Sequence, residues 1–225
     1  MNRTFECTVY DPNQYVGLEI IRDRANKTIF IYQSYVSRIL KLFNIENSTS
    51  AKAPAEPNYF LQKQENNPAG EVPYRQAVSM LKFLAIVSRP DIMFLVAQVS
   101  RFLDSPFKEH WTAVKKIFKY LKGMSDCGIC YSGANLEPQT YSNADYATDV
   151  DTRKSISEYT AIMAGGAVSW SWKQQKCVSR SRAKAEYVSA SDAAQEAQWL
   201  RTFLKELEVF EGLLLSLWIT GQPYK

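Results

Sequence analysis

The sequence YSNADYA, residues 141–147, opens the stretch of chain that decides the fold. It places Asp145 among residues that favour β-strands. Downstream, SWSWK at residues 169–173 alternates aromatic and small polar residues with the period of two that is typical of a half-buried strand. Residues 183–207 then repeat apolar residues at helical spacing, with Glu186 near the start. The sequence therefore predicts strands followed by one long helix, with a carboxylate on the first strand and another on the helix.

The N-terminal part of the chain predicts short strands and one short helix. Residues 15–21 and 28–32 are rich in β-branched and aromatic residues and flank a charged turn. Residues 35–43 place apolar side chains on one helical face. The segment over residues 48–73 is rich in Pro, Asn, Ala and Glu and has no hydrophobic period. It is therefore interpreted as a linker or an exposed loop.

Helical spacing continues through residues 74–122. A first helix should end or kink at Pro90, because proline has no backbone N–H to continue the helix. We expect a second helix over residues 92–102 and a third over residues 108–121. The outer face of the third carries Lys108, Lys115, Lys116, Lys119 and Lys122. These lysines either contact the phosphates of a nucleic acid or form an ordinary solvated face, and the charge pattern fits both readings.

Composition permits nucleic-acid binding without requiring it. The 225 residues are 46% apolar, which is enough for a packed core in one large or two small domains, and the formal charge is +4. Met1 begins no apolar run, so no secretory signal is expected. No stretch approaches the roughly eighteen apolar residues of a membrane span. We therefore expect an intracellular protein, cytoplasmic or nuclear, with no membrane partner.

The four cysteines are Cys7, Cys127, Cys130 and Cys177. Cys127 and Cys130 have the spacing of a metal-binding or redox pair. A zinc site would need a second such pair or a nearby histidine, and the single histidine of the chain is His110. Cys127 and Cys130 are therefore interpreted as buried or half-buried free thiols on a short strand, and the chain as reduced.

Short motifs along most of the chain resemble those of one family of polyproteins. The downstream group is YSNAD (141–145), RKS (153–155), GAVSW (166–170), AEY (185–187) and WLR (199–201). The upstream group is YVGLEI (15–20), PYR (73–75), RPDI (89–92), HW (110–111) and YLKG (120–123). In this order the motifs resemble the Pol polyprotein of copia-type retrotransposons. The downstream group is similar to its ribonuclease H domain, and the upstream group to the end of its reverse transcriptase.

The resemblance implies an α+β fold. We expect a helical remnant of the polymerase thumb and connection, followed by a ribonuclease H-like mixed sheet with helices that is truncated at the C-terminus. Residues 1–44 correspond to the end of the reverse transcriptase palm and thumb region, residues 45–73 to a linker, residues 74–134 to a helical connection, and residues 135–225 to an incomplete ribonuclease H-like domain. The strand over residues 213–220 would lack its covering helix, which predicts self-association through the truncated sheet.

The ribonuclease H resemblance also implies a carboxylate site for two divalent ions, roughly 3.5–4 Å apart. The family takes an aspartate from the opening strand, a glutamate from the first helix and an aspartate from a later strand. Glu186 matches the glutamate, but Asn143 and Thr220 occupy the two aspartate positions. Asp145 lies about 6.6 Å along the strand from Asn143, too far to take its place. Glu186 and Asp145 are thus the residual candidates for catalysis and for binding Mg²⁺ or Mn²⁺.

These substitutions favour a degraded retrotransposon Pol fragment that no longer catalyses. An alternative is a residual ribonuclease H-type endonuclease that cuts RNA/DNA hybrids with Mg²⁺ or Mn²⁺. A third hypothesis is a module that binds an RNA/DNA hybrid, a duplex nucleic acid or another partner without catalysis. DNA synthesis by this chain alone is excluded, because the paired aspartates of a polymerase hairpin occur nowhere in it.

Overall fold

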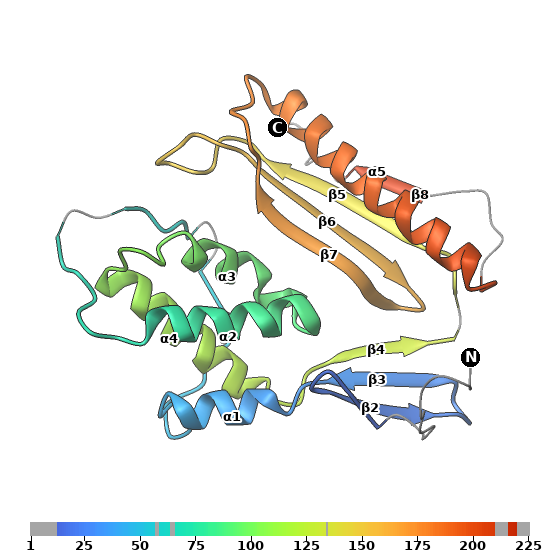
Figure 1. Cartoon of the computed structure of the whole chain (residues 1–225), viewed down its shortest axis with the longest axis horizontal. Coiled ribbons are helices and arrows are strands. Elements are labelled where there is room, and N and C mark those ends of the chain that lie inside the picture. The colour runs from blue at the N-terminus through green and yellow to red at the C-terminus, as the bar shows by residue number, and fades with distance from the viewer. Residues whose placement is uncertain (1–12, 57–58, 64–65, 134, 210–215, 220–225) are drawn as a thin grey trace, which may run out of the picture.

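The computed structural model describes residues 13–56, 59–63, 66–133, 135–209 and 216–219. Within them the chain is mixed α+β, as the sequence predicts, with two four-stranded sheets and five α-helices. Figure 1 shows a helical part beside the two sheets, and a long C-terminal helix that lies along the second sheet.

The first sheet is antiparallel and joins two distant parts of the chain. Its strands are β1 (Gln14–Tyr15), β2 (Leu18–Asp23), β3 (Thr28–Tyr32) and β4 (Ile129–Ser132), in that order. β3 has its predicted bounds, whereas the strand expected over residues 15–21 is interrupted at Val16 and Gly17, which both have positive φ. β4 pairs with β3, so the segments 1–44 and 74–134 share one sheet. The division of the chain into four segments stays a prediction.

The helical part holds the larger apolar core among the described residues. It contains α1 (Tyr35–Leu42), α2 (Tyr74–Val87), the 3-10 turn η1 (Pro90–Ile92), α3 (Met93–Ser100) and α4 (Lys108–Gly123). The three helices predicted over residues 74–122 are confirmed, and α2 ends just before Pro90, as expected. Leu81, Leu84, Ile117 and Phe118 are fully buried between the helices. The helical spacing of apolar residues in the sequence therefore predicts this core.

The described part of the segment over residues 45–73 contains no helix and no strand, but it packs against the helical part. Leu61 is buried, and its backbone N–H donates to Oε1 of Gln98 on α3 over 2.8 Å. The backbone N–H of Ala51 donates to the carbonyl of Lys119 on α4 over 3.1 Å. The segment is therefore fixed by contacts with two helices and is not a free spacer.

The second sheet is mixed. Its strands are β5 (Gln139–Asp145), β6 (Ile156–Met163), β7 (Gly166–Gln174) and β8 (Ser216–Ile219), in the order β7-β6-β5-β8. β5, β6 and β7 are antiparallel, and β8 runs parallel to β5 at the edge. α5 (Arg182–Glu206) covers one face of this sheet (Figure 1). The Ser181 hydroxyl caps α5 by accepting from the N–H of Lys184. Self-association through β8 stays a prediction.

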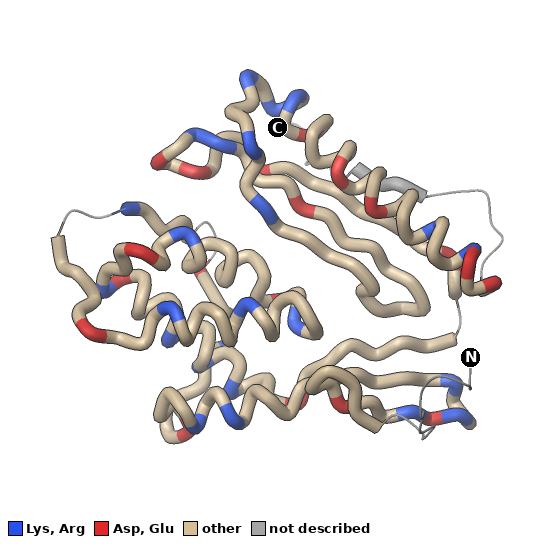
Figure 2. Tube along the Cα trace, viewed as in Figure 1, with Lys and Arg blue, Asp and Glu red and all other residues tan. Residues whose placement is uncertain are grey.

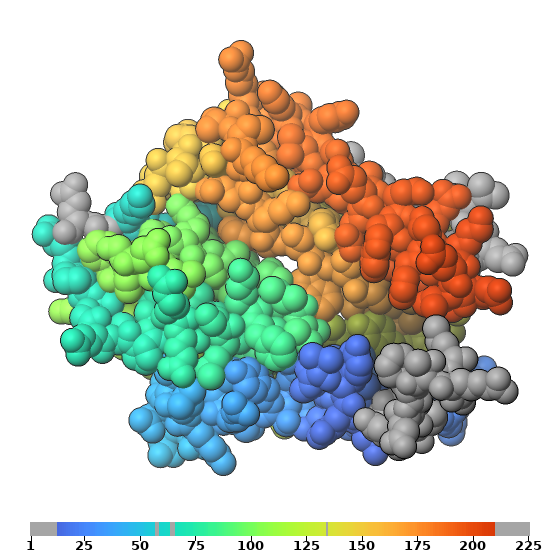
Figure 3. All heavy atoms as spheres, in the orientation of Figure 1, coloured from blue at the N-terminus to red at the C-terminus, as the bar shows by residue number. Residues whose placement is uncertain are grey.

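β7 is the strand of the second sheet that contacts both the first sheet and the helical part. The hydroxyl of Tyr131 on β4 donates to the carbonyl of Ala167 near the start of β7, over 2.7 Å. Further along, the indole N–H of Trp170 donates to the carbonyl of Ala85 on α2, over 2.8 Å. Figure 3 shows the helical part and the β7–α5 part as surfaces that touch. The second sheet is therefore attached both to the first sheet and to the helices.

A buried ion pair ties the end of α3 to the loop between β5 and β6. The guanidinium of Arg101 pairs with Asp149, whose side chain is only 1% exposed. Thr152 and Gln174 also donate to the Asp149 carboxylate. Burial alone would raise the pKa of Asp149, but the hydrogen bond from Thr152 and the charge of Arg101 outweigh it and hold that pKa below its usual value.

Replacing Arg101 by glutamine should lower the free energy of unfolding by about 2 kcal/mol at pH 7, because a buried carboxylate then loses its charged partner. The depressed pKa of Asp149 means that the pair stabilises fully above about pH 4, the unfolded pKa of aspartate, and less as the pH falls through the folded pKa. The loss measured by urea unfolding should therefore be smaller at pH 3 than at pH 7.

The matched control is Arg75→Gln, which removes an exposed ion pair with Asp104. It should change the free energy of unfolding by less than about 1 kcal/mol. Equal effects of the two substitutions at pH 7 would contradict the assigned role of Arg101.

Candidate functional site

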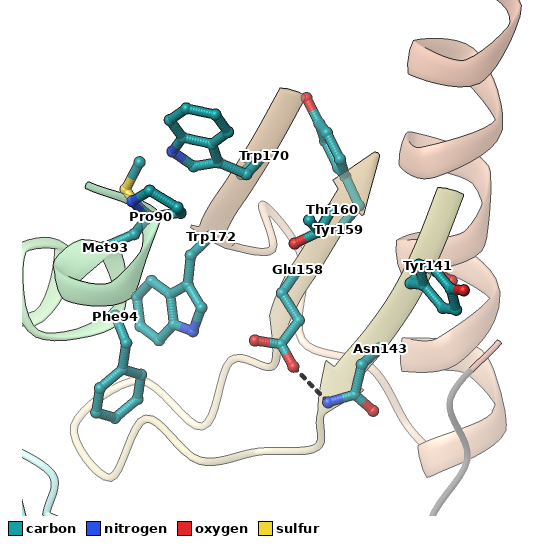
Figure 4. Close-up of a pocket in the computed structure, with 12 residues that line it drawn as sticks. Pro90, Met93, Phe94, Tyr141, Asn143, Glu158, Tyr159, Thr160, Trp170 and Trp172 are labelled. Carbon is teal, nitrogen blue, oxygen red and sulfur yellow. Dashed lines mark hydrogen bonds between the residues drawn. The ribbon is translucent and has the colours of Figure 1, made fainter. Parts of the chain in front are cut away.

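Strand alternation divides the residues of β5 between the two faces of the second sheet. Ser142 and Ala144 are buried on one face, whereas Asn143 and Asp145 are half-buried on the other. Figure 4 shows Asn143 on the same side of the sheet as the tryptophans of β7, which face η1 and α3. The candidate position Asn143 therefore lies between the second sheet and the helical part.

Asn143 is bound to a carboxylate that the sequence reading did not include among the site residues. The register of β5 and β6 pairs Asn143 with Glu158, and Nδ2 of Asn143 donates to Oε1 of Glu158 over 2.5 Å (Figure 4). The amide thus occupies one oxygen of this carboxylate. The pairing could not be read from the sequence, because the irregular connection over residues 146–155 does not set the register of the two strands.

α5 positions Glu186 near the end of β5. Burial raises the pKa of Glu186 and the charges of Asp145 and Glu158 raise it further, against the backbone N–H of Ala144 and the charge of Arg182. Its Oε2 is buried and has no hydrogen-bond partner among the described residues. Burial therefore disfavours the charged form of this carboxyl group, which is the form in which carboxylates bind metal ions.

Asp145 stands at the end of β5. Burial raises the pKa of Asp145, and the positive charge of Arg182 opposes the rise. The charges of Asp145, Glu158 and Glu186 are thus close enough to affect one another. Nevertheless, no three or more His, Cys, Asp or Glu side chains gather into a possible metal site in the part of the chain that the structure describes. Thr220, the other predicted ligand position, lies outside that part.

The lysine face of α4 is partly engaged by the chain itself. Lys116 forms an ion pair with Glu56, and Nζ of Lys122 donates to the backbone carbonyl of Ser48. Of the other three lysines on this face, only Lys108 is fully exposed. Contact between this face and nucleic acid stays a prediction.

A second group of basic side chains lies at one end of the second sheet. They come from the β5–β6 loop, the β7–α5 connection and the first turn of α5, and we call them the basic surface: Arg153, Lys176, Arg180, Arg182 and Lys184. All five are exposed, and the N–H of Gln175 donates to the carbonyl of Ser155 over 2.8 Å, which brings the two loops together. Figure 2 shows Lys and Arg gathered at these loops. Four basic and no acidic residues over residues 176–184 are a charge pattern that could have revealed this surface from the sequence.

Other reactive side chains do not gather with this site. Cys127, Cys130 and Cys177 are free. The prediction that Cys127 and Cys130 are buried or half-buried is wrong, because both are exposed and Cys130 lies at an exposed position of β4. Cys177 is also exposed, and Cys7 lies outside the described residues. None of the described helices is long and apolar enough to cross a membrane.

Asn143→Asp replaces an amide donor by a second carboxylate opposite Glu158. At pH 7 the like charges and the lost hydrogen bond should lower the free energy of unfolding by about 1–2 kcal/mol. The paired carboxylates should have a raised pKa, so the loss should be full above that pKa and shrink as the pH falls toward about 4. Urea unfolding at pH 7 and pH 4 measures the difference.

The control for this charge is Gln139→Glu, which adds a carboxylate on the same strand but opposite Ile162. It should destabilise less than Asn143→Asp at pH 7. A loss for Asn143→Asp that is the same at both pH values would show that the two side chains do not interact.

Comparison with known proteins identifies relatives over nearly the whole chain. The chain is 37% identical over 216 residues to a retrovirus-related Pol polyprotein from the tobacco (Nicotiana tabacum) transposon TNT 1-94, which covers 92% of the chain and 16% of that polyprotein. It is 35% identical over 175 residues to the Pol polyprotein from the Arabidopsis thaliana transposon RE2, covering 76% of the chain and 12% of the polyprotein. The chain therefore spans a small part of these relatives.

A shorter relative has a different name. The secreted RxLR effector protein 161 of Plasmopara viticola is 39% identical over 130 residues, which cover 57% of the chain and 92% of that protein. No family model matches the chain, and no solved structure matches it. The two long relatives are nevertheless both Pol polyproteins of transposons, and the motifs in both halves of the chain resemble the same kind of polyprotein. Homologues of this chain are retrovirus-related Pol polyproteins of transposons, and the chain is a retrotransposon-derived Pol segment.

Proposed function

We propose that residues 135–225 are a ribonuclease H-like domain that no longer cleaves nucleic acid, and that the preceding residues derive from the end of a reverse transcriptase. The observation that carries this proposal is the hydrogen bond from Asn143 to Glu158. An amide stands where the family has a metal-binding aspartate, and its N–H group is bound to the Glu158 carboxylate, whereas an aspartate there would be a second anion facing that glutamate.

The surroundings of the other candidate ligands support the same conclusion. Glu186 has a raised pKa and a buried oxygen without a hydrogen bond, so its charged form is disfavoured. Asp145 also has a raised pKa, through burial. Two-metal hydrolysis needs several ionised carboxylates around closely spaced ions. The amide at position 143 removes one anionic ligand at a family position, and burial disfavours the charged form of the other two carboxylates.

Access to Asn143 supports the proposal independently. Its face of the sheet is opposed by η1 and α3, which leave a cavity of about 300 Å³. A cavity of that volume lies at the lower end for small-molecule sites, and a hybrid duplex is far larger. The η1–α3 segment therefore restricts the approach of a duplex to Asn143 from the side of β7.

The unmodified chain should leave a labelled RNA/DNA hybrid intact in the presence of Mg²⁺ or Mn²⁺. Asn143→Asp combined with Thr220→Asp restores two anionic groups and should give trace cleavage at most. Glu186→Gln should abolish whatever cleavage appears, because it removes the remaining family ligand while keeping the size of the side chain. Gel electrophoresis of the labelled strands measures the product.

The alternative hypothesis of a residual ribonuclease H that uses Glu186 and Asp145 with Mg²⁺ or Mn²⁺ makes the opposite prediction. Robust cleavage by the unmodified chain that is lost in Glu186→Gln would establish it and overturn the proposal.

A second candidate function, binding of hybrid or duplex nucleic acid without cleavage, is favoured by the basic surface. Its side chains are exposed and come from two adjacent loops and the first turn of α5, as a phosphate-binding surface requires. The lysine face of α4 is the weaker candidate, because Lys116 is already paired with Glu56 and Lys122 with the backbone of Ser48.

Replacing Arg180, Arg182 and Lys184 by glutamine should weaken hybrid binding. It should also lower the slope of log affinity against log salt concentration by roughly 2–3. The matched control neutralises Lys115, Lys116 and Lys119 on α4 in the same way and should change the slope by roughly 1 or less. Fluorescence anisotropy at several salt concentrations measures both. A larger effect of the α4 variant would assign binding to the lysine face instead.

A further inference from the structure

The cavity beside Asn143 has aromatic walls and one charged residue. It lies between the exposed face of β5–β7 and the η1–α3 segment, and its volume is about 300 Å³. Figure 4 shows Trp170 and Trp172 of β7 on one side, Met93 and Phe94 of α3 beside them, and the side chain of Glu158 extending toward the space between the strands. The cavity therefore combines ring surfaces with a carboxylate.

The aromatic walls are held in place by other parts of the molecule. The Trp170 indole is bound to the carbonyl of Ala85 over 2.8 Å. The rings of Phe94 and Trp172 are perpendicular, at 88°, with centroids 5.3 Å apart. Phe94 packs in turn edge-on against Phe60, with centroids 6.0 Å apart. These contacts fix the rings before any ligand enters, so a ligand does not have to order them.

The charge of the cavity is negative. Glu158 is the only charged residue among those that line it, and Glu158 forms no ion pair within the described part of the chain. A second cavity of similar size on the far side of the β7 tryptophans is lined by Lys82 and by no carboxylate. A carboxylate without an ion-pair partner, in a cavity that aromatic side chains also line, attracts a cationic ligand.

The hydrogen bond from Asn143 restricts which cation fits. Oε1 of Glu158 already accepts from Asn143, so a ligand that uses this oxygen shares it with the amide. A guanidinium group binds carboxylates best through both oxygens at once, and here one of its two hydrogen bonds would compete with that amide. An alkylammonium group needs only one oxygen or the field of the carboxylate, and its methyl groups gain from contact with ring faces.

We propose that this cavity binds a methylated ammonium group, with Glu158 opposite its charge and the rings of Trp170, Trp172 and Phe94 around its methyl groups. The source of the group is a free quaternary amine or a methylated lysine side chain of a protein partner. The site needs neither cleavage nor nucleic-acid binding, so its test is independent of the function proposed above.

The proposal is tested by titrating the full chain with three soluble probes while tryptophan fluorescence is recorded, because Trp170 and Trp172 line the cavity. The probes are hydroxyethyl-trimethylammonium, its neutral isostere with carbon in place of nitrogen, and butylguanidinium. We expect saturable binding of the ammonium ion, about tenfold weaker binding of the neutral isostere, and weaker binding of the guanidinium. A parallel titration with a short peptide that contains trimethyllysine distinguishes a free amine from a protein side chain.

Glu158→Gln is the decisive variant, because glutamine keeps the shape and can still accept from Asn143 but has no charge. It should weaken ammonium binding about tenfold. Lys82→Gln, which alters the neighbouring cavity, is the control and should leave binding unchanged. If Glu158→Gln does not fold, the proposal is tested by comparing how tightly the unmodified chain binds the ammonium ion and its neutral isostere. Equal binding of those two probes, no saturable binding, or no effect of Glu158→Gln would overturn the proposal.

Discussion

The close approach of Gly166 to the ring of Tyr131 is the contact on which the arrangement of this chain depends. A Cβ atom at position 166 would lie 2.7 Å from that ring, so glycine is required for the start of β7 to reach β4. The Tyr131 hydroxyl then binds the carbonyl of Ala167, and β7 continues along the helical part to the bond between Trp170 and Ala85. One strand therefore holds the second sheet against both the first sheet and the helices.

The position of β7 decides what each face of the second sheet can do. The face with Asn143 and Glu158 is turned toward η1 and α3, so its polar groups line a small cavity with aromatic walls. α5 occupies the opposite face, from which the Ser189 hydroxyl donates to the backbone carbonyl of Asn143 over 2.5 Å. One packing arrangement thus affects both the proposed loss of nuclease activity and the kind of ligand that the cavity can bind.

Local patterns predicted the elements of the fold well, because hydrophobic periodicity is a property of neighbouring residues. The strand Thr28–Tyr32, the helix at Tyr35–Leu42 and the shared face of Trp170 and Trp172 all follow from spacing alone. Pairings between distant residues could not be predicted in this way. β4 joins β3 across about a hundred residues, and the partner of Asn143 depends on a strand register that an irregular loop leaves open. The role of Asn143 and Glu186 as positions of one site stays a prediction, and the sequence did not predict the contacts that these residues make.

A titration with Mn²⁺, followed by the electron paramagnetic resonance signal of the free ion, tests most directly the claim that the nuclease-like site no longer holds metal. With an amide at Asn143 and burial favouring the protonated form of Glu186, the account predicts that the free-ion signal grows in proportion to added Mn²⁺, as it does without protein. Stoichiometric loss of the signal, reversed by Glu186→Gln, would contradict the account.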